Sequence, residues 1–341
     1  MIDLLVAGGG PAGLATAIHA ALAGLDVVVA EPREAPIDKA CGEGLMPSAV
    51  RPLRELGVAV SGRPFHGIRY LEADGERRAE ALFRTGPGLG VRRTELHAAL
   101  AARAEELGVR RVPLRLEFPT QTEHDVTVGG LTARHLIAAD GLHSPLRRAL
   151  GLHRPTPPGR PARYGLRRHY AVEPWSDLVE VHWSRSSEAY VTPVADGLVG
   201  VAVLSGERLP FEAQLARFPQ LAARLPASAA TRVRGAGPLR QRVSARVAGR
   251  VLLVGDAAGY LDALTGEGVA VALASARALV ACLVEGRPQA YERAWRRASR
   301  EYRLLTASLL WARRQPVLAE RIVPLAAALP PLFRAGVNLL A

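Results

Sequence analysis

A glycine-rich turn near the start of the chain has the residue types and spacing that suit a phosphate group. In the run Gly8-Gly9-Gly10-Pro11-Ala12-Gly13, the first, third and last glycines match the G-x-G-x-x-G pattern of dinucleotide-binding turns. We expect Gly8 to permit the tight turn, Gly10 to let the backbone approach a pyrophosphate, and Gly13 to allow close packing of helix on strand. Together with Pro11 and Ala12, these residues are predicted to bind a cofactor.

The elements around this turn are those that the chemistry needs. An apolar run at residues 2–7 predicts a buried strand, and residues 14–23 predict a helix whose first N–H groups face the phosphates. A second predicted strand, residues 26–30, ends in Glu31, where a carboxylate accepts ribose hydroxyls and disfavours a 2′-phosphate. This end of the chain fits NAD and FAD alike.

A second glycine-rich segment follows another predicted strand far downstream. Residues 250–254 form a buried-strand pattern that runs into Gly255-Asp256-Ala257-Ala258-Gly259, and Thr265-Gly266-Glu267-Gly268 precedes a predicted helix at residues 269–283. With the first turn, this segment resembles the flavoprotein superfamily that holds aromatic hydroxylases, flavin halogenases and geranylgeranyl reductases. The resemblance implies FAD, with Asp256 on its ribityl chain and the helix start at Gly266, Gly268 and Val269 facing the flavin ring. No attachment residue is apparent, so we expect the FAD to be non-covalent.

Two further motifs extend the resemblance from Met1 to about Leu283. The run Ala139-Asp140-Gly141-Leu142-His143-Ser144-Pro145-Leu146-Arg147 is similar to the D-G-x-x-S-x-x-R signature of the superfamily, which implies that Asp140 lies near the flavin and nicotinamide sites. The run Arg93-Thr94-Glu95-Leu96, with Leu100, is similar to its R-x-x-L-x-x-x-L helix. The arginine of that helix, here Arg93, lies against FAD in the superfamily.

The branch of the superfamily is indicated by the segment Lys39-Ala40-Cys41-Gly42-Glu43-Gly44-Leu45-Met46-Pro47. This segment and Gly266-Glu267-Gly268 look more like the geranylgeranyl reductases than like the hydroxylases. However, Tyr190-Val191-Thr192-Pro193 lacks the tryptophan and phenylalanine that those reductases carry before a proline. The lysine used by halogenases has no counterpart, because Lys39 is the only lysine in the chain. The resemblance makes Cys41 and Glu43 candidate catalytic residues on a loop over the flavin, and Trp183 and Tyr190 candidate substrate contacts.

Three functions therefore stay open. The first is an FAD-dependent oxidoreductase that reduces a C=C bond in a lipophilic small molecule, isoprenoid or polyketide-like. The second is an NAD(P)H-dependent monooxygenase that hydroxylates an aromatic or polyketide ring, and the third is a flavin electron carrier without turnover of its own. In each of them the cofactor carries the electrons, while the protein supplies position and electrostatics.

Composition indicates a compact cytoplasmic protein. The formal net charge of +12 comes almost entirely from arginines spread along the 341 residues, and no nucleic-acid module is visible, so we predict no nucleic-acid partner. Cys41 and Cys282 lie far apart, which argues against a structural disulfide. The nine histidines lack metal-ligand spacing, so no metal site is predicted. The N-terminus lacks a basic signal-peptide region, and no apolar run has the length of a membrane span.

The motifs and the strand patterns predict an α/β fold with interleaved domains. A Rossmann-like FAD-binding domain takes residues 1–62, 90–155 and 245–285, with a helix at 94–107. An antiparallel-sheet substrate domain takes residues 63–89 and 156–244, after a linker at 155–163. Its expected elements are a hairpin turning at Asp74-Gly75, an amphipathic helix at 210–225, and strands at 164–171, 178–183, 189–194 and 198–204.

Residues 286–341 form a predicted C-terminal helical segment that is rich in arginine and then apolar. Two interpretations stay open for it. It packs across the two domains, or it makes a peripheral membrane contact through a basic and apolar surface that admits a lipophilic substrate. Its prolines exclude one continuous amphipathic helix.

Overall fold

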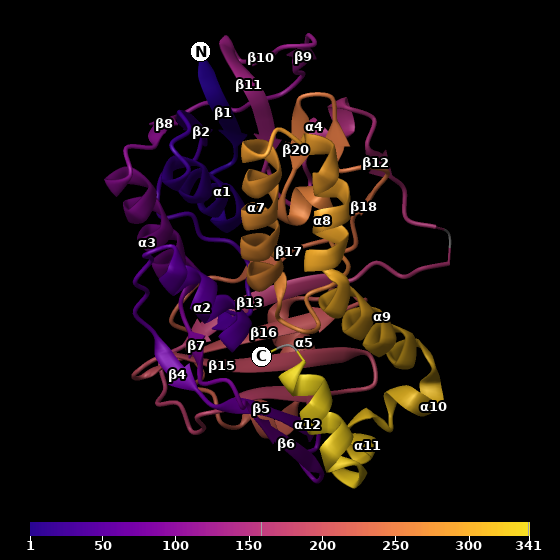
Figure 1. Cartoon of the computed structure of the whole chain (residues 1–341). Helices are drawn as coiled ribbons and strands as arrows, with labels where there is room; N and C mark the ends of the chain where they lie inside the picture. Colours follow the sequence, from indigo (N-terminus) through magenta and orange to yellow (C-terminus); the bar gives the residue numbers. More distant parts are fainter. Residues whose placement is uncertain (158, 340) are drawn as a thin grey trace.

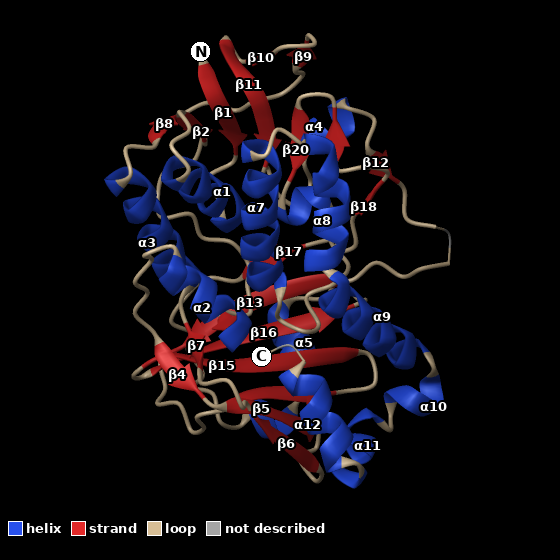
Figure 2. Cartoon of the chain, viewed as in Figure 1, coloured by secondary structure: helices blue, strands red, loops and turns tan. Residues whose placement is uncertain are grey.

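Two large sheets, one above the other in the view of Figure 1, make up the body of the protein. The computed structural model describes residues 1–157, 159–339 and 341. Figure 2 shows helices gathered around the first sheet and along one side of the second. This arrangement confirms the predicted α/β class with a Rossmann-like domain, an antiparallel-sheet layer and a C-terminal helical segment.

The first sheet has eight strands with a parallel centre. Its main path runs β19-β20-β11-β1-β2-β8, and the antiparallel strands β10 and β9 extend from β11. The apolar sequences of β1 and β2 are buried almost throughout, as expected for parallel strands covered on both faces. The strand bounds are β1 Ile2–Ala7, β2 Val27–Ala30, β8 Arg110–Val112, β9 Thr120–Gln121, β10 Val126–Val128, β11 Leu131–Ala138, β19 Val247–Ala248 and β20 Val251–Leu253.

Three helices lie beside this sheet, and each begins close to where the sequence predicts. They are α1 (Pro11–Leu22), α3 (Arg93–Glu106) and α7 (Gly268–Val284), and α1 packs against both of the others. Shorter helices are α2 (Pro47–Glu55), α4 (Pro145–Ala149) and two 3-10 helices, Gly255–Ala258 and Pro288–Ala290.

The second sheet has seven strands in the order β17-β13-β16-β15-β14-β5-β6. The predicted hairpin is present as β5 and β6, and its turn contains Gly75 with φ +79°. The sheet is antiparallel as expected, with one difference: β5 pairs with β14 in parallel. A parallel pair needs a long crossover, which the intervening excursion through the first sheet provides. The bounds are β5 Gly67–Glu72, β6 Arg78–Leu82, β13 Tyr164–Tyr170, β14 Val179–Trp183, β15 Ser187–Ala195, β16 Leu198–Ser205 and β17 Arg234–Ala236.

Short elements join the two sheets and differ most from the sequence expectations. A three-stranded sheet of β3 (Gly44–Leu45), β7 (Gly88–Gly90) and β4 (Arg63–Phe65), and the pair β12 (His153–Arg154) and β18 (Arg242–Val243), were not predicted. The single helix expected at 210–225 was wrong. It is divided into α5 (Phe211–Leu215) and α6 (Pro219–Ala222), because Pro219 has no N–H and restricts the residue before it.

All strands of the first sheet fall within the ranges predicted for the FAD-binding domain, and all strands of the second fall within those of the substrate domain. The domain boundaries themselves stay a prediction. The predicted linker at 155–163 includes residue 158, which lies outside the described residues.

The C-terminal region bridges both sheets. It consists of α8 (Tyr291–Ala298), α9 (Arg300–Arg314), α10 (Pro316–Ala319), α11 (Ile322–Ala328) and α12 (Pro330–Asn338). At one end α8 packs on α7, and at the other α11 and α12 pack on β6 (Figure 1). Asn338 fixes the last helix by donating to the Leu82 carbonyl and accepting from the Arg84 N–H group. Across residues 1–157, 159–339 and 341, no helix has the length and apolar character that a membrane span requires.

Candidate functional site

The turn between β1 and α1 is shaped to admit a ligand at one point and closed elsewhere. Gly8 has φ +109°, and a Cβ there would lie 2.5 Å from the Ala139 carbonyl oxygen. A Cβ on Gly13 would lie 1.9 Å from the Gly8 carbonyl oxygen, so helix and strand touch. By contrast, a Cβ on Gly10 would meet nothing within 4 Å. The free space at Gly10 lies at the start of α1, where unpaired N–H groups attract phosphate.

The two glycine-rich motifs form one groove. A Cβ on Gly255 would lie 2.6 Å from the Cβ of Ala12, so the 255–258 turn packs directly on the first turn of α1. Arg147, which is fully buried, fixes this contact by donating to the backbone carbonyls of Asp256 (3.3 Å), Ala257 (3.1 Å) and Leu142 (2.8 Å). The arginine of the D-G-x-x-S-x-x-R motif therefore joins that motif to the Gly-Asp motif.

The predicted carboxylates of the groove differ in their surroundings. Glu31 is buried and accepts hydrogen bonds from the Gly9 N–H (2.9 Å) and the Arg33 guanidinium (2.8 Å). Burial opposes the charged form, but the bonds from Arg33 and Gly9 lower the pKa of Glu31, which stays ionised. Arg33 lines the cavity and Glu31 lies behind it, so a direct ribose contact for Glu31 stays a prediction. Asp256 accepts from Lys39 Nζ at 3.2 Å, across 217 residues of sequence.

Several buried polar atoms of residues in the cavity wall have no partner in the described part of the chain, and two of them lie in the predicted cofactor motifs. One is Nη1 of Arg93, at the first residue of α3, and the other is Oδ1 of Asp140, directly after β11. Burial raises the pKa of Asp140, whose other oxygen accepts the Leu146 N–H at 3.0 Å. An unpaired buried donor and acceptor cost free energy unless a ligand satisfies them. Together with the space at Gly10, they fit an extended cofactor that has phosphate, hydroxyl and carbonyl groups.

The start of α7 closes the groove on its third side. Gly266, Gly268 and Val269 line the cavity, where the first N–H groups of the helix have no intrahelical acceptor. Glu267 does not line the cavity. Its buried carboxyl accepts a hydrogen bond from the Ser48 hydroxyl at 3.4 Å, and burial raises its pKa to about 8. The helix therefore presents backbone dipoles to the groove, while the Glu267 side chain takes no part in the cavity wall.

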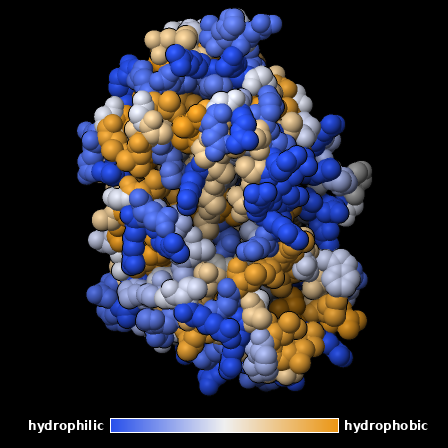
Figure 3. All heavy atoms as spheres, viewed as in Figure 1, coloured by the Kyte–Doolittle hydropathy of each residue, from blue (hydrophilic) through white to orange (hydrophobic). Residues whose placement is uncertain are grey.

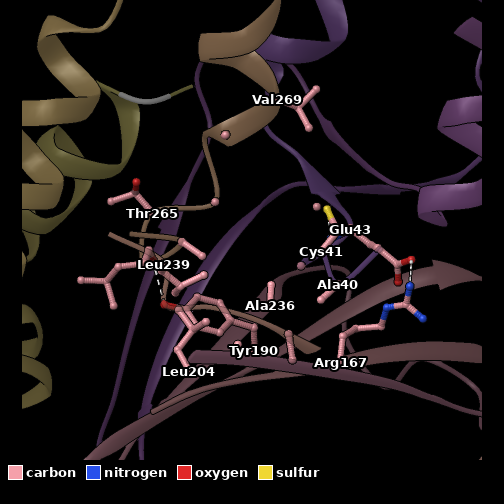
Figure 4. Close-up of a pocket in the computed structure, with 18 of the residues that line it drawn as sticks. Ala40, Cys41, Glu43, Arg167, Tyr190, Leu204, Ala236, Leu239, Thr265 and Val269 are labelled. Carbon is pink, nitrogen blue, oxygen red and sulfur yellow. Dashed lines mark hydrogen bonds and ion pairs between the residues drawn. The ribbon is translucent and has the colours of Figure 1, made fainter. Parts of the chain in front are cut away.

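The loop that leads into β3 brings Cys41 and Glu43 together but turns them in different directions. Cys41 lines the cavity, and burial raises the pKa of its thiol, with Glu43 adding to the effect. Figure 4 shows the Glu43 carboxylate turned toward Arg167, and the Cys41 sulfur on the side of the loop nearer Val269. Glu43 adopts φ +61° and is buried.

Glu43 belongs to a buried polar network that sequence reasoning missed. Its Oε1 accepts the Arg93 N–H at 2.8 Å, and its Oε2 lies 2.5 Å from Nε2 of His169. Arg167, on the same strand, lies 3.7 Å from Glu43 and pairs with Asp38. The available signal was Arg167 and His169 two residues apart in β13, which places both side chains on one face of the strand.

The groove opens into a wider space above the second sheet, and together they form one cavity of about 1190 Å³. Tyr190 lines it and donates its hydroxyl to the Leu264 carbonyl at 2.8 Å, with Leu204, Ala236 and Leu239 around it (Figure 4). Trp183 is not among the lining residues. It packs behind Tyr70, which lines the cavity, at a ring centroid distance of 5.1 Å. The structure therefore brings Tyr190, but not Trp183, to the cavity wall.

A family model described as an FAD binding domain matches residues 1–197 of this chain. The chain belongs to this FAD-binding family. The prediction of FAD and of the flavoprotein superfamily is confirmed, and the protein is an FAD-dependent oxidoreductase. The segments of this flavoprotein that line the groove come from both ends of its sequence, including the 255–269 region that lies outside the matched residues.

Known proteins are similar to this flavoprotein over most of its length. A menaquinone reductase of Mycobacterium tuberculosis is 33% identical over 324 residues, which cover 84% of this chain and 77% of that protein. A digeranylgeranylglycerophospholipid reductase of Methanopyrus kandleri is 29% identical over 307 residues, covering 81% of this chain and 78% of that protein. A solved flavoprotein/dehydrogenase from Cytophaga hutchinsonii has a TM-score of 0.86 at 20% identity, covers 99% of this chain, and has 92% of its own length covered. That likeness shows the fold alone.

Proposed function

We propose that this flavoprotein reduces a carbon–carbon double bond in a lipophilic small molecule, isoprenoid or polyketide-like. The observation that carries the proposal is the continuity of the cavity. One cavity is lined by the residues of the FAD groove and also by apolar side chains of the second sheet and of α11 and α12. The two relatives named above as reductases, one of menaquinone and one of an isoprenoid lipid, support this substrate class.

The cofactor, when bound, supplies a hydride to one carbon of the double bond. The other carbon then needs a proton, and we assign its delivery to the Cys41 thiol. Burial and the Glu43 carboxylate keep this thiol protonated, and Arg93 opposes that effect and favours the thiolate that remains after transfer. One C=C bond, one hydride and one proton give one saturated C–C bond, and Cys41 regains its proton from water before the next turnover.

Glu43 is proposed as a positioning residue rather than as the acid. Both of its oxygens already have partners, the Arg93 N–H and His169. These bonds hold the loop that carries Cys41 against α3 on one side and β13 on the other. Tyr190 and the leucines around it are proposed to contact the hydrocarbon chain, with Trp183 supporting Tyr70 from behind.

We further propose that the C-terminal region takes the substrate from a membrane, and that NAD(P)H or another reductant restores the reduced cofactor. Helices α11 and α12 form the wall of the cavity farthest from the groove, which supports uptake from that side. No contact in the described residues identifies the electron donor, and NAD(P)H rests on the superfamily resemblance.

The test is an anaerobic incubation of the dithionite-reduced protein with a detergent-dispersed prenylated quinone and, separately, with a geranylgeranyl lipid. We expect the flavin to be reoxidised. After any quinol has been oxidised back to the quinone in air, the product should still carry two additional hydrogen atoms by mass spectrometry. An oxygenated product formed in air with NAD(P)H would instead support the monooxygenase. Reoxidation without any product would support the electron carrier.

A further inference from the structure

The wall of the cavity farthest from the FAD groove is formed by two short helices, α11 and α12. Each helix contributes the side chains of one face. On α11 and the residue after it, the lining side chains are Ile322, Leu325, Ala326 and Leu329, which is the i, i+3, i+4, i+7 spacing of a single helical face. On α12 they are Leu332, Phe333, Gly336 and Val337, again one face. Both faces are apolar throughout, so this wall offers no hydrogen bond to a ligand.

Part of this wall is open to the outside. Leu325, Leu329 and Leu332 line the cavity and are nevertheless 44%, 49% and 68% exposed. Side chains that belong to a cavity wall and also reach the surface mark its mouth. Figure 3 shows a group of hydrophobic side chains over the α10 to α12 end of the molecule. We call Leu325, Leu329 and Leu332 the mouth leucines.

Positive charges outnumber negative ones in the C-terminal region that carries the mouth leucines. Residues 286–341 contain ten arginines and three glutamates. Arg321 at the start of α11 and Arg334 within α12 are both exposed, and neither forms an ion pair within residues 1–157, 159–339 and 341. Exposed leucines between unpaired arginines suit a lipid bilayer, which has an apolar acyl region and, where anionic lipids are present, negatively charged headgroups.

We infer that α11 and α12 are a docking surface for a bilayer that contains anionic lipids. The mouth leucines enter the acyl region, and Arg321 and Arg334 contact lipid phosphates. This inference rests on the proposed function, because it lets a lipophilic substrate pass from the bilayer into the cavity without crossing water. A second copy of this chain is a poorer occupant, since two surfaces that carry unpaired arginines repel each other.

The first experiment measures vesicle binding of the FAD-loaded full chain by flotation, with phosphatidylcholine alone and with added phosphatidylglycerol. We expect binding to the anionic vesicles and weak binding to the neutral ones. Leu332→Glu should lower the affinity at least about tenfold, because a charge replaces an inserted apolar side chain. Leu22→Glu is the matched control, since Leu22 is 52% exposed on α1, and it should bind as the wild type does.

The second experiment removes the cations. Arg321→Gln with Arg334→Gln should weaken binding to anionic vesicles by roughly fivefold for each arginine. Arg148→Gln on α4 is the control, because Arg148 is also exposed. The double variant should keep its activity on a short, water-soluble substrate and lose activity on a vesicle-borne one.

Equal flotation of Leu332→Glu and Leu22→Glu, or binding independent of phosphatidylglycerol, would overturn the inference. A dimer that dissociates in Leu332→Glu would assign the surface to a second copy instead. Flotation does not depend on turnover, so a protein that floats as expected and reduces no substrate refutes the proposed reaction and leaves the docking surface in place.

Discussion

At the scale of residues, the glycine turn allows a matched test of the cofactor groove. Gly10→Val should fold, because its side chain would enter free space, yet it should occupy the room of the pyrophosphate. Asp256→Ala removes the predicted ribityl acceptor, and its loss should cost about 1–3 kcal/mol of FAD binding. Fluorescence titration of the apoprotein should show weaker FAD binding in both variants. Wild-type FAD affinity in both folded variants contradicts the assignment of the two motifs to one site.

Gly13→Val is the contrasting variant. Its Cβ would lie 1.9 Å from a backbone oxygen, so the protein should fail to fold whether FAD is present or not. Circular dichroism of the apoproteins separates a blocked groove, as in Gly10→Val, from a disrupted strand-helix contact.

Replacement of Cys41 tests its role in proton delivery. Cys41→Ser and Cys41→Ala should keep FAD content and flavin reduction while slowing the substrate half-reaction by roughly 10²-fold or more, the usual contribution of a positioned acid. Stopped-flow absorbance at the flavin band measures the two half-reactions separately. Unchanged product formation in both variants removes Cys41 from the mechanism and leaves it as a side chain that fills the cavity wall.

Glu267 predicts a pH dependence of stability. Its pKa is raised by burial to about 8, above the ordinary value of 4.5, so the folded state holds a proton that the unfolded state releases. Stability from this group is therefore fully present below about pH 4.5 and is lost as the pH rises toward about 8, by roughly 3–5 kcal/mol. Glu267→Gln should remove that loss. Denaturant unfolding at about pH 6 and about pH 9 should show a smaller difference for the variant, and identical pH profiles would contradict the assignment.

At the scale of elements, the network between the Cys41 loop and β13 predicts strong coupling. His169→Gln leaves the buried Glu43 carboxylate without its closest side-chain partner and should destabilise the protein by roughly 3 kcal/mol. Glu43→Gln with His169→Gln should cost less than the sum of the two single changes. A double-mutant cycle from urea unfolding measures this coupling, and additive costs would show that the pair acts independently.

The sequence predicted long elements better than short ones. Runs such as residues 2–7 and 269–283 carry enough apolar positions to reveal a strand or a helix, and both lie close to where they were expected. The strands β3, β4 and β7 have two or three residues each, too few for a periodic pattern. Their existence depends on partners distant in sequence, and so does the parallel pairing of β5 with β14.

At the scale of the whole molecule, the cofactor groove was more predictable than the chemistry around it. Each glycine motif has a local sequence pattern that predicts a turn followed by the start of a helix. The contacts between Lys39 and Asp256, and between Glu43 and His169, join residues separated by 217 and 126 positions. No local pattern predicts such pairs, because they arise when segments distant in the sequence pack together in the folded protein. For the same reason Trp183 could not be placed behind Tyr70 from the sequence.

The insertion of β20 beside β11 also has a consequence for how the chain is made. Until the segment from Val251 to Val284 leaves the ribosome, Arg147 has no Asp256 or Ala257 carbonyl to bind, and α1 lacks the helix α7 that packs on it. A nascent chain that ends before β20 therefore has the phosphate turn but only part of the groove. Free FAD in the cell should assist folding only after translation has passed this point. Until then, the part of the groove that is already synthesised should stay exposed to solvent.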